Sequence, residues 1–108
     1  MRSVVRSLFE REGFEVFEAE NGPQGVEQAE KLHPSLVVLD LHMPGMNGLE
    51  AARAIQTTSP GVPLLMFTNM AVPGLEREAR YAGISAVVSK TEPTENLIAR
   101  AKELVTKN

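Results

Sequence analysis

The stretch of sequence that decides the fold is LVVLDLHMPGMNG, which spans residues 36–48. Its first four residues are continuously apolar, a pattern typical of a short strand that is buried on both faces of a parallel sheet. Asp40 ends this apolar run, and the glycines and the proline that follow it are typical of a loop. The sequence therefore predicts a buried strand over residues 35–40 that delivers a carboxylate to one end of a sheet.

On both sides of this stretch, apolar residues recur with the spacing of helices that alternate with short strands. Helices are expected over residues 2–12, 23–32, 49–57, 75–82 and 97–105, and strands over residues 14–19, 35–40, 62–67 and 84–89. Such alternation favours right-handed crossovers and a parallel sheet that helices cover on both faces. We therefore expect a doubly wound α/β fold with four strands and five helices, which forms one domain over residues 1–108.

The composition excludes several classes of function. With 108 residues, 43% of them apolar, the chain suits one small domain, so any further domain must lie outside this sequence. The formal charge is −3 and no basic run is present, so direct binding of nucleic acid is not expected. The absence of cysteine excludes a disulfide framework and a thiolate metal site. No apolar run reaches membrane-spanning length, and we expect a cytoplasmic protein without a membrane partner.

Three polar residues follow apolar strands, namely Asp40, Thr68 and Lys90. Ligands of open α/β sheets bind at the carboxyl ends of the strands, where these three side chains are expected to meet. A carboxylate can attack a phosphoryl group to form an acyl phosphate, while an ammonium group and a hydroxyl hold the phosphoryl oxygens. Each residue alone is better explained as a turn residue, a β-former or a solvated charge, so the functional interpretation rests on the three together.

The quoted stretch resembles the acceptor strand and loop of the receiver domains of bacterial two-component response regulators, whose pattern is D-x-x-M-P-x-M-[DN]-G. Thr68 and Lys90 match the two other signature positions of that family. The resemblance implies a flavodoxin-like (CheY-like) fold with strand order 2-1-3-4-5. It also implies that Asp40 accepts a phosphoryl group from a histidine kinase, a phosphotransfer protein or a small donor. The domain is then a signalling switch for an output domain or protein, and not an enzyme.

Magnesium is the cofactor that the resemblance implies, with the Asp40 carboxylate and the backbone carbonyl of His42 as ligands. The family's first strand and the acidic pair at its end have no counterpart in this sequence. Since Mg²⁺ is held mainly by carboxylates, water and phosphate oxygens, we expect weak binding. Two smaller departures are Val87 at the position of the family's aromatic switch residue, and Thr91, Glu92 and Pro93 after Lys90 where a proline commonly follows directly.

In the implied strand order the first strand lies between the second and the third, so its absence leaves a seam in the sheet. We expect this seam to be closed either by residues 14–19 moving into the vacant position or by exchange with a second copy, which makes a homodimer. Two other functions stay open. One is a pseudo-receiver that binds partners independently of phosphorylation. The other is an aspartate-nucleophile phosphatase, which is disfavoured because His42 stands where that chemistry needs a carboxylate.

Overall fold

The computed structural model describes residues 2–19, 21–40, 47–69 and 73–106, which form five helices and three strands. The elements in chain order are α1 (Arg2–Arg11), α2 (Gly22–Leu32), β1 (Val37–Leu39), α3 (Gly48–Thr58), β2 (Leu64–Thr68), α4 (Leu75–Tyr81), β3 (Ala86–Ser89) and α5 (Thr94–Thr106). Their alternation confirms the α/β class predicted from the sequence, and all five expected helices are present.

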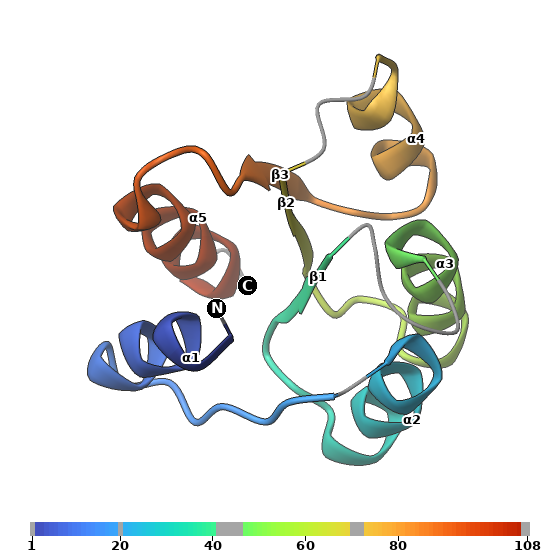
Figure 1. The fold of residues 1–108 in the computed structure, drawn as a ribbon. Helices are drawn as coiled ribbons and strands as arrows, with labels where there is room; N and C mark the ends of the chain where they lie inside the picture. Colours follow the sequence, from blue (N-terminus) through green and yellow to red (C-terminus); the bar gives the residue numbers. More distant parts are fainter. Residues whose placement is uncertain (1, 20, 41–46, 70–72, 107–108) are drawn as a thin grey trace.

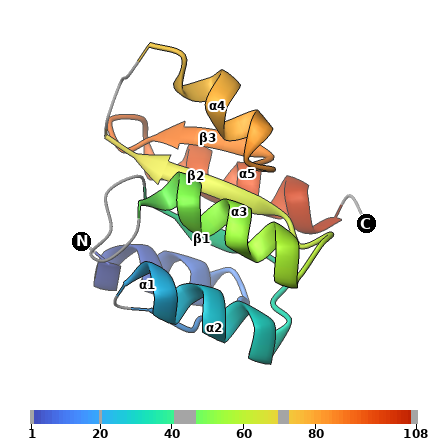
Figure 2. The same ribbon diagram turned by 90° about the vertical axis from the view of Figure 1, so that its right-hand side faces the viewer.

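The three strands form one parallel sheet in the order β1-β2-β3. Helices α1 and α5 lie on one side of this sheet, and α2, α3 and α4 lie on the other (Figure 1). Figure 2 shows the same sheet from the side of α2 and α3. The central strand β2 is buried along its whole length, as the continuous apolar pattern of its sequence predicts. The fold is therefore doubly wound.

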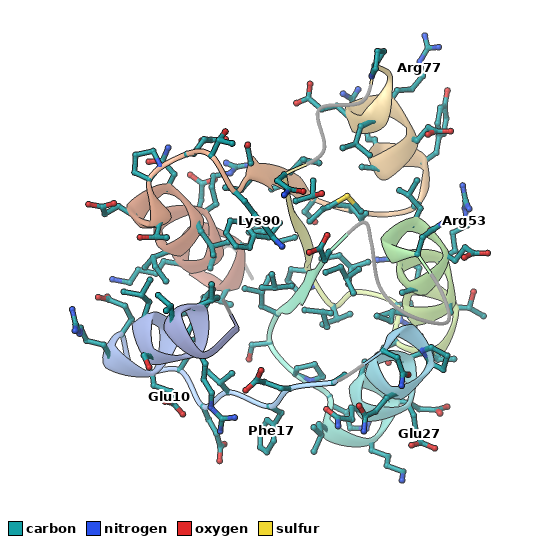
Figure 3. All side chains as sticks on the ribbon, in the orientation of Figure 1. Glu10, Phe17, Glu27, Arg53, Arg77 and Lys90 are labelled. Atoms are coloured by element: carbon teal, nitrogen blue, oxygen red, sulfur yellow. The ribbon has the colours of Figure 1, made fainter. Side chains whose placement is uncertain are left out.

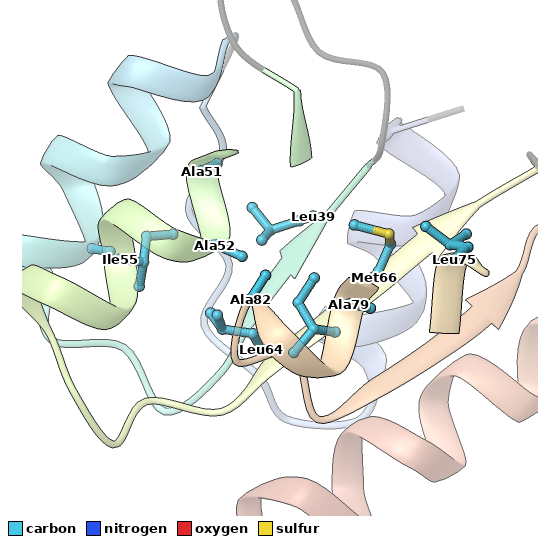
Figure 4. Packing of buried hydrophobic residues seen from close by; sticks show 11 residues of the cluster. Leu39, Ala51, Ala52, Ile55, Leu64, Met66, Leu75, Ala79 and Ala82 are labelled. Atoms are coloured by element: carbon cyan, nitrogen blue, oxygen red, sulfur yellow. The ribbon is translucent and has the colours of Figure 1, made fainter. Parts of the chain in front are cut away.

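Each face of the sheet packs against its own hydrophobic cluster. Toward α2, α3 and α4 lies a cluster centred on Leu39, Ile55, Leu64 and Met66 (Figure 4). Toward α1 and α5 lies a second cluster that includes Phe9, Leu65, Phe67 and Leu97. Alternate residues of β2 enter the two clusters because successive side chains of a strand point to opposite faces.

Short polar signals fix the ends of the helices. The Asn21 side chain accepts a hydrogen bond from Gln24 N at the start of α2, and Asn47 forms a reciprocal capping box with Glu50 at the start of α3. His33 closes α2 in the left-handed conformation, with φ 48°. His33 is thus the residue that ends α2, and the capping box fixes where α3 begins.

The strand expected over residues 14–19 is not present, and this prediction was wrong. The alternation of apolar residues in this segment arises because one face of the segment is buried. Phe14 and Val16 pack against the α1–α5 cluster, while Phe17 is exposed. A strand also needs a neighbour for its backbone hydrogen bonds, and the only strand that β1 pairs with among the described residues is β2. Residues 14–19 therefore have not moved into the seam, and β1 is an edge strand in the described part of the chain.

Within the described residues, no helix combines the length and the apolar character that crossing a membrane requires.

Candidate functional site

Asp40 and Lys90 meet across the carboxyl end of the sheet, although 50 positions separate them in sequence. Asp40 directly follows β1, and Lys90 directly follows β3. The Lys90 ammonium donates a hydrogen bond to Asp40 Oδ2 at 2.5 Å. Figure 3 shows Lys90 extending from the end of β3 toward the middle of the molecule. The side chains of Asp40 and Lys90 are 31% and 19% exposed, so this ion pair is partly shielded from water but open to a ligand.

Thr68 is the last residue of β2, the strand between the other two. Its side chain is buried, and its backbone carbonyl accepts a hydrogen bond from the Lys90 backbone N–H at 2.9 Å. Thr68 also pairs in register with Ser89, the residue before Lys90. The structure therefore places the three residues singled out in the sequence at the carboxyl ends of three adjacent parallel strands. His42, the fourth expected site residue, lies outside the described residues.

The turn that carries Lys90 is held by Glu92, a residue that the sequence reasoning did not assign to the site. The Glu92 carboxylate accepts hydrogen bonds from the Ser89 backbone N–H at 3.1 Å and from Asn96 Nδ2 at 2.9 Å. The hydrogen bond from Asn96 and then that from Ser89 lower the pKa of Glu92. The spacing of Glu92 and Asn96 by four residues was the available signal. All peptide bonds of the described chain are trans, including the bond before Pro93 in this turn.

A second residue missed by the sequence reasoning is Phe67. The Lys90 Nζ atom lies 5.7 Å from the centroid of the Phe67 ring, within the range of a cation–π interaction. Nothing in the sequence indicates this contact, because Phe67 also fits a plain core position next to Thr68. The aromatic residue near the site is thus on β2, while Val87 is an aliphatic residue packed against the α2–α3–α4 cluster and Tyr81 is exposed at the end of α4.

The described residues do not form a magnesium cage by themselves. They contain no group of three or more His, Cys, Asp or Glu side chains that could hold a metal ion. Asp40 supplies a carboxylate of the kind that Mg²⁺ prefers, but one of its oxygens already contacts the Lys90 ammonium. One carboxylate paired with a cation is a poor site for a divalent cation, and the weak binding of Mg²⁺ expected from the sequence stays a prediction.

The fold and the strand-end residues define a flavodoxin-like α/β domain with a polar site at the carboxyl edge of its sheet. The sequence model of the response regulator receiver domain matches residues 1–102, and the chain belongs to this family. The structure is similar to the crystal structure of a CheY-like receiver domain protein from Methanospirillum hungatei. The two are 24% identical, with a TM-score of 0.92 over 98% of this chain and 85% of that one.

Two relatives with similar sequences are longer proteins than this chain. The chain is 39% identical over 94 residues to a protein-glutamate methylesterase/protein-glutamine glutaminase of Methanosarcina acetivorans, covering 85% of this chain and 27% of the relative. It is 34% identical over 106 residues to BvgA of Bordetella pertussis, a positive transcription regulator of virulence factors, covering 97% of this chain and 51% of the relative. The chain thus spans between about a quarter and a half of the length of these relatives.

Proposed function

We propose that residues 1–108 form a phosphoacceptor signalling module of a two-component phosphorelay, with Asp40 as the acceptor. The observation that carries this proposal is the Asp40–Lys90 ion pair at the end of the sheet, directly beside Thr68. The phosphodonor is a histidine kinase or a phosphotransfer protein. Because the phosphoryl group of such donors comes from ATP, we propose that the module acts in the cytoplasm.

In the proposed reaction an Asp40 carboxylate oxygen attacks the phosphorus atom, and a P–O bond forms. The bond between phosphorus and the donor's leaving atom breaks, and that atom keeps the electron pair and takes up a proton. The product is an acyl phosphate on Asp40. The Lys90 ammonium lies beside the carboxylate and can pair with the negatively charged phosphoryl oxygens once they are transferred. The Thr68 hydroxyl can donate a hydrogen bond to one of these oxygens.

The proposed output is a change of protein contacts, so the domain acts as a signalling switch that is itself modified and not as an enzyme that converts a separate substrate. The methylesterase and the transcription regulator named above are longer proteins, which supports an output domain or protein beyond residues 1–108. Magnesium, if bound, is held through the Asp40 carboxylate and the backbone carbonyl of His42. We expect this binding to be weak, since the described acidic residues do not gather around Asp40.

The proposal is tested by incubating the chain with acetyl phosphate and following its mass under denaturing conditions. The expected result is slow addition of one phosphoryl group, which Asp40→Asn abolishes. Glu12→Gln is the matched control, because Glu12 is a carboxylate that also pairs with a lysine, Lys102, but lies away from the strand ends. Labelling that persists in Asp40→Asn contradicts the proposal.

A pseudo-receiver is the second candidate, and the same ion pair is what favours it. A carboxylate that pairs with Lys90, and that has no cluster of acidic neighbours among the described residues, can serve as a structural ion pair and not as a nucleophile. This function predicts no labelling of the wild-type chain under any magnesium concentration, together with partner binding that is the same for wild type and Asp40→Asn.

A further inference from the structure

Lys90 is a long and flexible side chain that must be held in place to act on a group at Asp40. Its four-carbon stem has a large rotamer freedom, and ordering it against one partner alone is entropically costly. The main chain of Lys90 is fixed by the hydrogen bond to the Thr68 carbonyl. That bond leaves the stem free, so a second contact on the side chain is needed to aim the ammonium.

The ring of Phe67 provides that contact. Phe67 is 7% exposed and is fixed in the cluster toward α1 and α5, next to Val88, with which it pairs in register. Its neighbour Thr68 points to the opposite side of β2 because side chains alternate along a strand. The end of β2 thus carries an aromatic face on one side and a hydroxyl on the other, with the Lys90 ammonium 5.7 Å from the ring centroid.

We propose that Phe67 is a positioning residue that holds the Lys90 ammonium against the Asp40 carboxylate through the face of its ring. A leucine fills a similar core volume but has no quadrupole to attract a cation, so the effect depends on the ring and not on packing. The ammonium then interacts with both a ring face and a carboxylate, and both contacts favour one rotamer of the stem. The consequence for phosphoryl uptake rests on the function proposed above.

The first test is spectroscopic and does not depend on phosphorylation. In the wild-type chain, nuclear Overhauser contacts are expected between the Lys90 ε-methylene and the Phe67 ring protons, together with an upfield ring-current shift of that methylene. Phe67→Leu should abolish the shift and Phe67→Tyr should keep it. Phe9→Leu is the matched control, because Phe9 is an equally buried phenylalanine of the same cluster. A Lys90 shift that is unchanged in Phe67→Leu overturns the proposal.

The second test separates the charge of the ring face from its shape. Pentafluorophenylalanine placed at residue 67 by codon suppression keeps the ring but reverses its quadrupole. The rate of uptake from acetyl phosphate should fall by about two- to tenfold in this variant and in Phe67→Leu, while Phe67→Tyr and Phe9→Leu keep the wild-type rate. Measurable and equal rates in the wild type and all these variants overturn the positioning role. If no variant takes up phosphoryl but the Lys90 shift still depends on Phe67 alone, the proposed phosphoacceptor function fails and the positioning contact stands.

Discussion

Val38 of β1 and Leu65 of β2 lie opposite each other in the sheet and on the same face, yet their surroundings differ. Leu65 is completely buried in the cluster toward α1 and α5, whereas Val38 is 37% exposed. In the segment between α1 and α2, Phe17 is 58% exposed as well. The molecule thus has a closed part, built on β2 and β3, and an open edge formed by β1 and residues 14–19.

The candidate site lies on the border between these two parts. Thr68 and Lys90 are carried by the closed part, and Asp40 by the short edge strand. In the described structure the edge strand is tied to the rest of the site by the Asp40–Lys90 ion pair and by its pairing with β2. The residues proposed to bind the phosphoryl group, Thr68 and Lys90, therefore lie in the closed part, and the proposed acceptor lies at the open edge.

The largest effect is expected when the two opposed residues are truncated in turn. Leu65→Ala should lower the free energy of unfolding by about 2–5 kcal/mol, since it removes buried methyl groups and leaves a cavity. Val38→Ala, on the same face one strand away, should cost about 1 kcal/mol or less because its side chain is already partly in water. Urea denaturation of both variants measures the difference. Equal losses would show that the edge is as well packed as the centre.

The open edge should next be visible in the oligomeric state. Edge strands present backbone groups that pair with another chain, and identical chains most often close as dimers. We therefore expect a homodimer in which the edge beside β1 is covered by a second copy. Size exclusion coupled to light scattering tests this over a wide range of concentrations. A folded monomer throughout that range contradicts the prediction of a dimer formed by exchange.

Magnesium affinity tests the open edge at the site itself, by comparing residues 1–108 with chains extended at the N-terminus. A chain extended at its N-terminus by a strand that ends in two acidic residues should bind Mg²⁺ at least about tenfold more tightly than residues 1–108, because each carboxylate adds a ligand of the preferred kind. The same strand ending in two asparagines is the control for its packing effect. Calorimetric titration of the three chains measures the affinities, and equal affinities would show that the added carboxylates do not contribute to Mg²⁺ binding.

The smallest effect is expected at Glu92, in the closed part. Its pKa in the folded chain is lowered from 4.5, so its hydrogen bonds stabilise the fold above that value and are lost as the pH falls through the lower folded pKa. Glu92→Gln should therefore lower the stability slightly near neutral pH, where the carboxylate is charged in the wild type, and flatten the acid limb of the stability profile. Glu95→Gln removes a carboxylate from the same end of α5 and serves as control. An unchanged acid limb in Glu92→Gln contradicts this role.

The sequence predicted the elements that build the closed part and the residues at their ends. Continuous apolar runs before Asp40 and Thr68, and a mostly apolar stretch before Lys90, indicate parallel strands, and the carboxyl ends of such strands meet at one edge of the sheet. The same reasoning failed for residues 14–19. Alternation of apolar residues indicates that one face of a segment is buried, but it does not show that a neighbouring strand is available for its backbone hydrogen bonds. This reasoning also missed Phe67, since its contact with Lys90 depends on side-chain rotamers that no spacing rule encodes. For Glu92 the four-residue spacing to Asn96 was a signal, but that spacing does not imply the hydrogen bond to the Ser89 N–H that holds the turn.

The most direct test of the account is to locate the phosphoryl group on the chain. After exposure to acetyl phosphate, an aspartyl phosphate can be reduced with borohydride to homoserine, which peptide mass spectrometry then places in the sequence. The account predicts homoserine at residue 40 and unchanged residues at the other acidic positions. Homoserine at another position, a phosphoryl group on a histidine, or an unmodified chain after prolonged exposure would contradict Asp40 as the acceptor.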